Sequence, residues 1–180
     1  MTIFAGILAR YSNSGIPGSI IEALQGAISR HPDDKNALIE YKNNNIYFAK
    51  IDIGALGELG HFTDSQLSGF IAGNPILQQN SGNVYSRLES LKFLASDISK
   101  DNLEVLRNCR GTYCAAIYDH ENGKLFLVTD KIGVRPVYFW VHSDFVIFAS
   151  ALRILESLRH HQKEIDLKGI TEIACFGYPL

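Results

Sequence analysis

Residues 111–150 read GTYCAAIYDHENGKLFLVTDKIGVRPVYFWVHSDFVIFAS. This stretch holds four apolar runs that are rich in aromatic and β-branched residues, and it predicts four β-strands in succession. Two of the strands are joined by Glu121-Asn122-Gly123 and two by the segment 130–136. Asn-Gly between apolar runs is a strong hairpin signal, because both residues tolerate the positive φ that matches the twist of paired strands.

The rest of the chain alternates between strand-like and helix-like patterns. Ser19 followed by Glu22 predicts a capping box at the start of a helix. Two antiparallel sheets, each packed on the other by one face and covered by helices on its second face, satisfy the order of the elements. The further predicted elements are strands at 2–9, 37–42, 46–53, 55–62 and 67–72, and helices at 20–30, 83–97, 101–108, 150–158 and 167–176.

Composition limits the class of protein and its partners. The chain has 180 residues, of which 46% are hydrophobic and 20% charged, as expected for one folded globular domain. A net charge of −2 provides no broad positive surface, so neither nucleic acid nor an anionic membrane is expected as a partner. No apolar run has the length of a membrane span, and the N-terminus lacks a signal-peptide pattern. Cys109, Cys114 and Cys175 have no metal-ligand spacing, so we expect a reducing, cytoplasmic location and no metal site.

Motifs in the quoted stretch closely resemble the core of the class II glutamine amidotransferase domain that begins asparagine synthetases. In that family the stretch runs G-x-F-A-F-A-x-Y-D, then R-D-x-x-G-x-x-P-L-Y-Y, then F-A-S-E. The positions that match the second motif are Asp130, Gly133, Pro136 and Tyr138, and residues 148–150 match the third. The resemblance implies an α+β fold, the four-layer α/β/β/α sandwich of N-terminal nucleophile hydrolases.

The glycine turn in the second motif has two interpretations. Asp130 and Arg135 flank Gly133 and could pair with one another or anchor a partner domain. An Asp in a tight loop also readily accepts hydrogen bonds from backbone N–H groups. We therefore interpret Asp130, Gly133, Arg135 and Pro136 as a structural turn or a domain interface.

The family's glutaminase chemistry needs four groups, and the first two differ here. Thr2 stands where the family has its N-terminal Cys nucleophile, and a hydroxyl is far less acidic than a thiol. The family binds the carboxylate of glutamine with an Arg on an early strand. Lys50 lies in about the right strand, but it cannot make the two-point contact of an Arg, and we interpret it as a surface lysine.

The other two groups differ as well. The family's oxyanion pair Asn-Gly is inverted to Gly73-Asn74, and losing one oxyanion donor costs about 10²–10³ in rate. The simplest interpretation of Asn74 is a turn residue before Pro75. The Asp that binds the ammonium group of glutamine has no carboxylate counterpart at residues 81–84. Because catalytic groups that act as a unit fail as a unit, we expect the glutamine pocket to be lost.

The resemblance thus predicts the N-terminal amidotransferase-like domain of an asparagine synthetase-related ligase, of the asparagine synthase, β-lactam synthetase or lasso-peptide cyclase type. Residues 1–160 would form this domain, with an inactive glutaminase and a structural role. Residues 161–180 resemble the connection into an ATP-using synthetase module, which would be the partner in cis or, as a subunit, in trans. ATP and magnesium are expected only there, and no cofactor is expected in this chain. A homodimer is a further expected form of association.

Two other functions stay open. A working amidohydrolase would lose Met1, use Thr2 as its N-terminal nucleophile on glutamine or another amide, and use Gly73 and Asn74 at the oxyanion. A stand-alone interaction protein would keep its C-terminal tail ordered without a partner. The substrate and the amine donor of a larger protein do not follow from the sequence.

Overall fold

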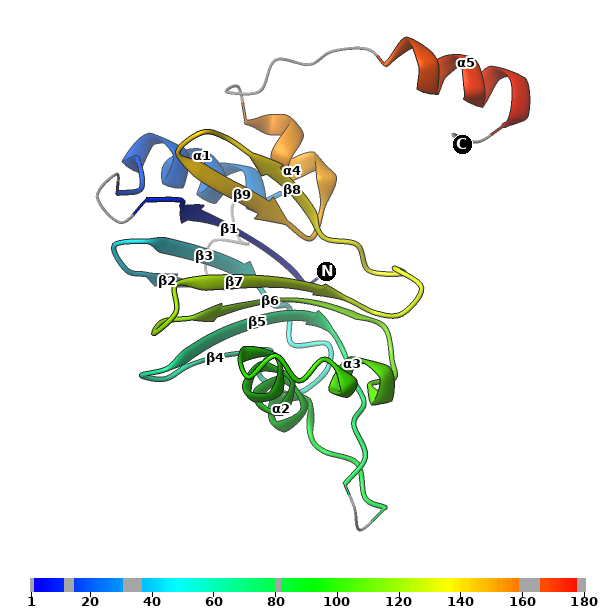
Figure 1. Ribbon diagram of the computed structural model, residues 1–180. Coiled ribbons are helices and arrows are strands. Elements are labelled where there is room, and N and C mark those ends of the chain that lie inside the picture. The colour runs from blue at the N-terminus through cyan, green and yellow to red at the C-terminus, as the bar shows by residue number, and fades with distance from the viewer. Residues whose placement is uncertain (1, 12–14, 31–36, 80–81, 159–165, 178–180) are drawn as a thin grey trace.

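Two antiparallel sheets form the body of the computed structural model, which describes residues 2–11, 15–30, 37–79, 82–158 and 166–177 (Figure 1). One sheet has five strands in the order β2-β3-β1-β9-β8, and the other has four in the order β4-β5-β6-β7. The strands are β1 (Ile3–Ala9), β2 (Leu38–Lys42), β3 (Ile46–Ile51), β4 (His61–Thr63), β5 (Leu67–Gly73), β6 (Tyr113–Asp119), β7 (Lys124–Thr129), β8 (Tyr138–Val141) and β9 (Phe145–Ala149). The helices are α1 (Gly18–Ile28), α2 (Arg87–Ser99), α3 (Glu104–Asn108), α4 (Leu152–Ser157) and α5 (Leu167–Phe176).

The two sheets pack face to face over a shared apolar layer. The five-stranded sheet contributes Phe4, Phe48 and Phe148 to this layer, and the four-stranded sheet contributes Phe70 and Tyr118. The rings of Phe48 and Phe70 stack across the interface with their centroids 4.6 Å apart. This layer joins the two sheets into one core.

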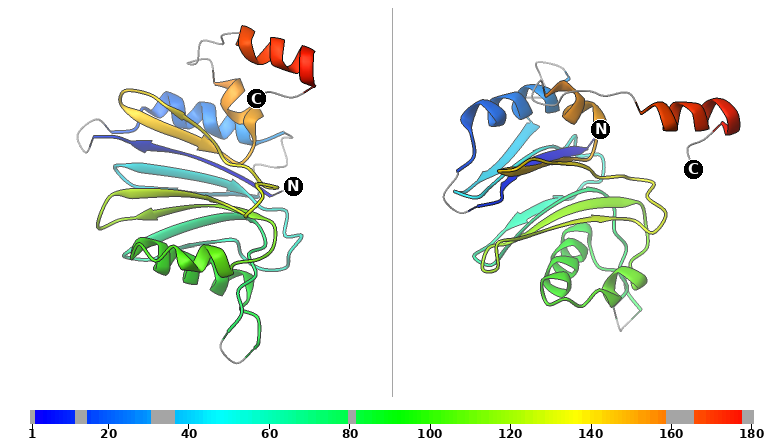
Figure 2. Two further views of the ribbon diagram at one scale, coloured as in Figure 1. Left: turned by 45° about the vertical axis from the view of Figure 1, so that its right-hand side comes forward. Right: turned by 45° about the horizontal axis from the view of Figure 1, so that its top comes forward.

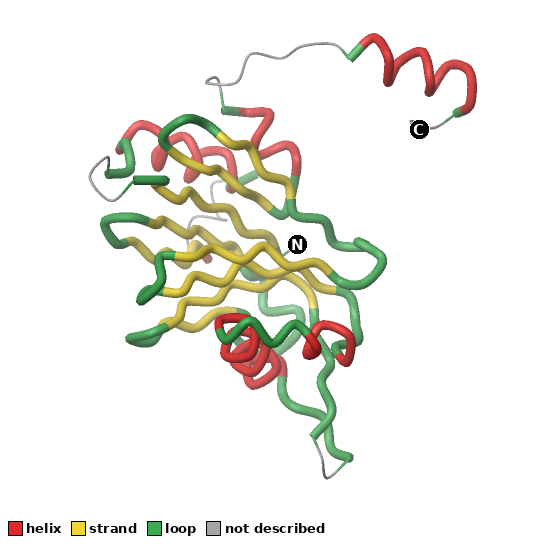
Figure 3. Tube along the Cα trace, viewed as in Figure 1, coloured by secondary structure: helices red, strands yellow, loops and turns green. Residues whose placement is uncertain are grey.

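Helices cover the outer face of each sheet. α1 and α4 pack on the five-stranded sheet through Leu24, Ile28 and Ile154. α2 packs on the four-stranded sheet through Leu91 and Leu94, and α3 lies beside it (Figure 2). The layers are therefore helix, sheet, sheet and helix (Figure 3), which confirms the predicted four-layer sandwich. Because strands β1 and β3 are covered on both faces, their sequences do not alternate between apolar and polar residues, and Lys50 is the one charged residue in either strand.

The segment 130–137 carries the chain from one sheet to the other. The four strands predicted between 111 and 150 are confirmed, but β7 and β8 belong to different sheets, so this segment is a crossover. Asp130 is buried, and its carboxylate accepts the backbone N–H groups of Val134 and Arg135, each at 3.0 Å. Gly133 has a φ of +67°, which L side chains rarely adopt. The carboxylate of Asp130 therefore binds backbone groups of its own loop.

The structure corrects the predicted start of the first helix. α1 begins at Gly18 after Pro17, and no side chain caps it. Ser19 already lies inside the first turn, so it cannot take the N-cap position, and the predicted capping box with Glu22 is wrong.

Two predictions in the middle of the chain also differ from the structure. α2 begins at Arg87 and not at residue 83, because Val84 pairs with Gln78 in a β-bridge. Ser86 and Glu89 form the capping box that starts this helix. Residues 55–60 form a loop where a strand was predicted, and only the three residues of β4 follow as a strand.

Helix α5 stands apart from the sandwich (Figure 1). It confirms the helix predicted at 167–176, yet none of its residues is buried. Its large apolar residues are between 52% and 74% exposed; they are Leu167, Ile170, Ile173 and Phe176. Asp166 caps the N-terminal end of the helix, and Gly177 ends it with a φ of +80°.

Some predictions fall on residues outside the described ranges, namely Met1, Ser81 and the end of the tail after Gly177. Within the described ranges, no helix is both long enough and apolar enough to cross a bilayer.

Gly6 allows the aromatic layer to close around β1, where it pairs with Phe48 on one side and Phe148 on the other. A Cβ at this position would overlap the Phe148 ring and lie 2.6 Å from the carbonyl oxygen of Tyr47. We expect Gly6→Ala to lower the free energy of unfolding by about 1–3 kcal/mol, the usual cost of overpacking a core. Urea denaturation measures this change.

Gly26→Ala in α1 is the matched control, because nothing lies within 4 Å of its added Cβ. Alanine favours the helix, so this variant should gain about 0.5–1 kcal/mol. A loss of the same size in both variants would contradict the packing argument.

Candidate functional site

Polar residues gather where strands β1 and β3 end and helix α2 begins. The β1–β3 register pairs Ile3 with Ile51, so the residues next to this pair, Thr2 and Asp52, lie side by side. The hydroxyl of Thr2 donates to the carboxylate of Asp52 at 2.9 Å. We call the following four residues the Asp52 cluster: Thr2, Lys50, Asp52 and Arg87.

Lys50 is fully buried, so its interpretation as a surface lysine is wrong. Its ammonium group lies 2.8 Å from the carboxylate of Asp52 and donates to the carbonyl of Gly60 at 2.7 Å. Gly60 permits this approach, because a Cβ there would overlap the Lys50 ammonium group and lie 2.6 Å from the Arg87 guanidinium. The loop before β4 therefore closes over Lys50 and removes it from water.

Arg87, like Asp52, is a residue of the site that our sequence analysis missed. It is 4% exposed, and its guanidinium lies 3.3 Å from the Asp52 carboxylate. The same guanidinium donates to the carbonyls of Glu58 at 2.7 Å and Gly73 at 2.9 Å. Arg87 thus ties the 52–60 loop, the end of β5 and the start of α2 to Asp52.

A detectable signal for both cations exists in the sequence. Counted from the true start of α2, Arg87 falls on the helical face of Leu91, Leu94 and Ile98, all of which are buried. Lys50 interrupts the run Ile46–Ile51, in which every residue is buried. A charge inside an apolar pattern points to a buried partner of opposite sign.

Burial and the neighbouring charges shift the pKa values of the residues in and beside the cluster. Burial lowers the pKa of Lys50 from 10.5 to about 8, and Asp52 opposes this shift only in part. Burial alone would raise the pKa of Asp52, but hydrogen bonding and charge from Lys50, together with the Thr2 hydroxyl, hold it well below its usual range. Burial and the charge of Lys50 also lower the pKa of the neighbouring His61. Asp52 is therefore a firmly ionised acid held between two cations.

Gly73 and Asn74 lie at the end of β5, next to the cluster. Gly73 has a φ of +94°, and a Cβ there would lie 2.7 Å from the Arg135 side chain. The carbonyl of Gly73 accepts from Arg87, and the N–H of Asn74 donates to the carbonyl of Thr112 at 3.0 Å. The side chain of Asn74 lines a hollow of about 180 Å³ beside Arg87. The structure thus brings Thr2, Lys50, Gly73 and Asn74 to the same end of the sandwich.

These contacts restrict what the site can do chemically. The Thr2 hydroxyl donates its proton to a carboxylate whose pKa is far too low for an efficient general base. Lys50 and Arg87 are engaged with Asp52 and with backbone carbonyls. In the described part of the chain, no group of three or more His, Cys, Asp or Glu side chains could hold a metal ion.

Comparison with known proteins indicates a glutamine amidotransferase domain. Residues 94–179, from α2 to beyond α5, match the family described as the glutamine amidotransferase domain. This match confirms the resemblance to glutamine amidotransferases that the motifs indicated.

The chain matches only part of the length of each similar protein. Asparagine synthetase [glutamine-hydrolyzing] 2 of Bacillus subtilis (strain 168) is 33% identical over 58 residues, which are 32% of this chain and 8% of that protein. The glutamine phosphoribosylpyrophosphate amidotransferase from B. subtilis, complexed with ADP and GMP, is 18% identical with a TM-score of 0.44. A structure described as the allosteric regulatory enzyme of purine biosynthesis is 16% identical with a TM-score of 0.46. Both structural matches cover 86% of this chain and 37% of the other chain.

The buried ion pair predicts a strong difference between two variants. Asp52→Asn leaves the charges of Lys50 and Arg87 buried without their acid, which typically costs about 3–5 kcal/mol. Lys50→Met removes one cation, while Asp52 keeps Arg87 and Thr2, so the loss should be much smaller. Chemical denaturation of both variants measures the difference. Equal destabilisation would show that Asp52 does not offset the two buried cations.

The lowered pKa of Lys50 predicts a dependence of stability on pH. Between about pH 8 and 10.5 the unfolded chain binds more protons at Lys50 than the folded chain does, so the free energy of unfolding should rise with pH. From pH 7.5 to 9.5 we expect wild type to gain about 2 kcal/mol relative to Lys50→Met. Denaturation curves across this range measure the gain, and parallel pH profiles would refute it.

Proposed function

We propose that this chain is the amidotransferase-type domain of a larger ligase related to asparagine synthetase, and that it does not hydrolyse glutamine. The observation that carries the proposal is the Asp52 cluster, in which the polar groups nearest to Thr2 already bind one another. A glutaminase pocket needs such groups free to meet the substrate.

The nucleophile is the first reason for inactivity. A hydroxyl at the N-terminus needs its own α-amine as a base and a strongly stabilised oxyanion. Here the Thr2 hydroxyl donates to Asp52, and the N–H of Asn74 is occupied by Thr112. The Thr2 hydroxyl is therefore not poised to attack an amide, and the Asn74 N–H is not free to bind an oxyanion.

Substrate binding is the second reason. The carboxylate of glutamine would need a cation that is exposed in the pocket, whereas the cations nearest to Thr2 are 0% and 4% exposed. Asp52 lies between them, 2.8 Å from Lys50 and 3.3 Å from Arg87. The carboxylate of Asp52 therefore neutralises Lys50 and Arg87 in place of a substrate carboxylate.

The exposed apolar residues of helix α5 favour a structural role within a larger protein. A ten-residue helix that buries none of its residues is marginal in water, so its exposed apolar residues favour a covering partner. We propose that this partner is a synthetase domain in cis or a synthetase subunit in trans, which would also hold ATP and magnesium. The small share of the relatives' lengths that this chain spans is compatible with that arrangement.

The test is ammonia release from glutamine by the untagged wild type and by Thr2→Cys, with the intact mass reporting whether Met1 is removed. We expect no ammonia from either protein, because Thr2→Cys restores the nucleophile but not the pocket. Unfolding curves for both proteins verify that each is folded. Thr2→Ala is the control for any activity found.

Activity in wild type that is lost in Thr2→Ala would favour the alternative of a working hydrolase that uses Thr2. Activity in Thr2→Cys alone would mean that the pocket is intact and only the nucleophile was lost. Either result would contradict the proposal.

A further inference from the structure

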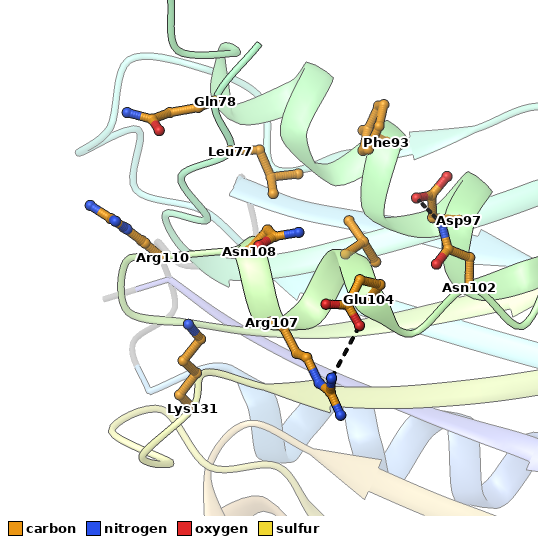
Figure 4. Close-up of a pocket in the computed structure, with 11 residues that line it drawn as sticks. Leu77, Gln78, Phe93, Asp97, Asn102, Glu104, Arg107, Asn108, Arg110 and Lys131 are labelled. Atoms are coloured by element: carbon orange, nitrogen blue, oxygen red, sulfur yellow. Dashed lines mark hydrogen bonds and ion pairs between the residues drawn. The ribbon is translucent and has the colours of Figure 1, made fainter. Parts of the chain in front are cut away.

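A second hollow lies on the outer side of the four-stranded sheet, away from the Asp52 cluster. It measures about 490 Å³, and helices α2 and α3 form much of its wall (Figure 4). It shares none of its lining residues with the Asp52 cluster. Its volume lies within the range of about 300–1,000 Å³ that is usual for small-molecule sites.

Two cations mark one end of this hollow. Arg110 and Lys131 lie together on one side of it in Figure 4. Both are exposed, and neither side chain has a hydrogen-bond or ion-pair partner among the residues that the structure describes. Two like charges that face one space repel, so an anion placed between them would be favoured.

Backbone hydrogen bonds fix the chain at both cationic residues. Arg110 forms a β-bridge with Ile76, with two N–H···O bonds of 2.8 and 2.9 Å. Lys131 follows Asp130, whose N–H donates to the carbonyl of Tyr113 and whose carboxylate fixes the loop. A ligand would therefore have to order the two side chains but not the backbone that carries them.

The opposite end of the hollow is acidic. Asp97 of α2 and Glu104 of α3 lie there in Figure 4. Asp97 accepts from the amide of Asn102 at 2.8 Å, which orients its carboxylate without neutralising it. Glu104 pairs with Arg107 at 3.3 Å, but both side chains are more than half exposed, and such a surface pair is weak.

Leu77 and Asn108 lie between the two charged ends in Figure 4. Leu77 and Val105 are buried, and Phe93 is 42% exposed at the wall on the α2 side. The hollow therefore has a positive end, a middle that combines Leu77 with the amide of Asn108, and an end where the carboxylates of Asp97 and Glu104 outnumber the guanidinium of Arg107. Few molecules match all three features, and a simple anion or a polyanion does not.

We propose that this hollow binds an elongated zwitterion of the size of a di- or tripeptide with free ends. Its carboxylate lies against Arg110 and Lys131, its ammonium group lies against Asp97 and Glu104, and its side chains contact Leu77 and Phe93. The proposal goes beyond the proposed function, because it requires neither glutaminase chemistry nor a synthetase partner.

The test is a titration of the ¹⁵N-labelled full chain with the tripeptide Ala-Leu-Ala, followed by amide chemical shifts. We expect saturable shifts confined to residues around the hollow, with a Kd on the order of 1 mM or lower. Ala-Leu-Ala with an amidated C-terminus should bind at least about tenfold more weakly, and the N-acetylated peptide should also bind more weakly. Inorganic phosphate tests whether any anion suffices.

Variants locate the binding. The double variant Arg110→Gln, Lys131→Gln removes two exposed cations and should weaken Ala-Leu-Ala binding at least about tenfold without unfolding the protein. Lys124→Gln, an exposed lysine at the other end of β7, is the matched control and should bind as wild type. The proposal is overturned if no saturable shifts occur, if the amidated peptide or phosphate binds equally well, or if the double variant binds as tightly as wild type.

Discussion

One carboxylate, Asp52, holds the N-terminal end of the chain to both sheets. It binds Thr2 at the start of β1, Lys50 of β3 and Arg87 of α2. Arg87 in turn binds the carbonyl of Gly73 at the end of β5, so the network passes from the five-stranded to the four-stranded sheet. Two neighbouring cations could not be buried without this acid, because each would be an uncompensated charge away from water.

Under the proposed function, the location of this network explains how the fold can persist without glutamine hydrolysis. Catalytic groups have to remain partly unpaired until the substrate arrives, and that need costs stability. In this chain Asp52 pairs with both Lys50 and Arg87 at the corresponding end of the sandwich, and the second terminal nitrogen of Arg87, Nη2, is buried without a hydrogen-bond partner. The apolar layer around Phe48 and Phe70 does not depend on glutamine binding, so the scaffold can be kept for packing alone.

The sequence revealed local features well and distant pairings poorly. Strands β6 to β9 were predictable, because the Asn-Gly turn and the apolar runs are signals within a few residues. The crossover at 130–137 was not, because the destination of β8 depends on a neighbour, β9, and on the side of the core that it must cover. Lys50 was misjudged because most single lysines are solvated. Arg87 was missed because placing the helix start at residue 83 hid its position on the buried face.

The crossover also shapes the order in which the chain can fold. Strands β4 to β7 are consecutive in sequence, whereas the five-stranded sheet combines strands from the two ends of the chain and pairs β1 with β9 across about 140 residues. During synthesis from the N-terminus, all four strands of the four-stranded sheet emerge while one edge of β1 still lacks its neighbour. Long-range pairing of this kind slows folding. An uncovered apolar strand at the start of the chain is therefore exposed to aggregation until the last strand emerges.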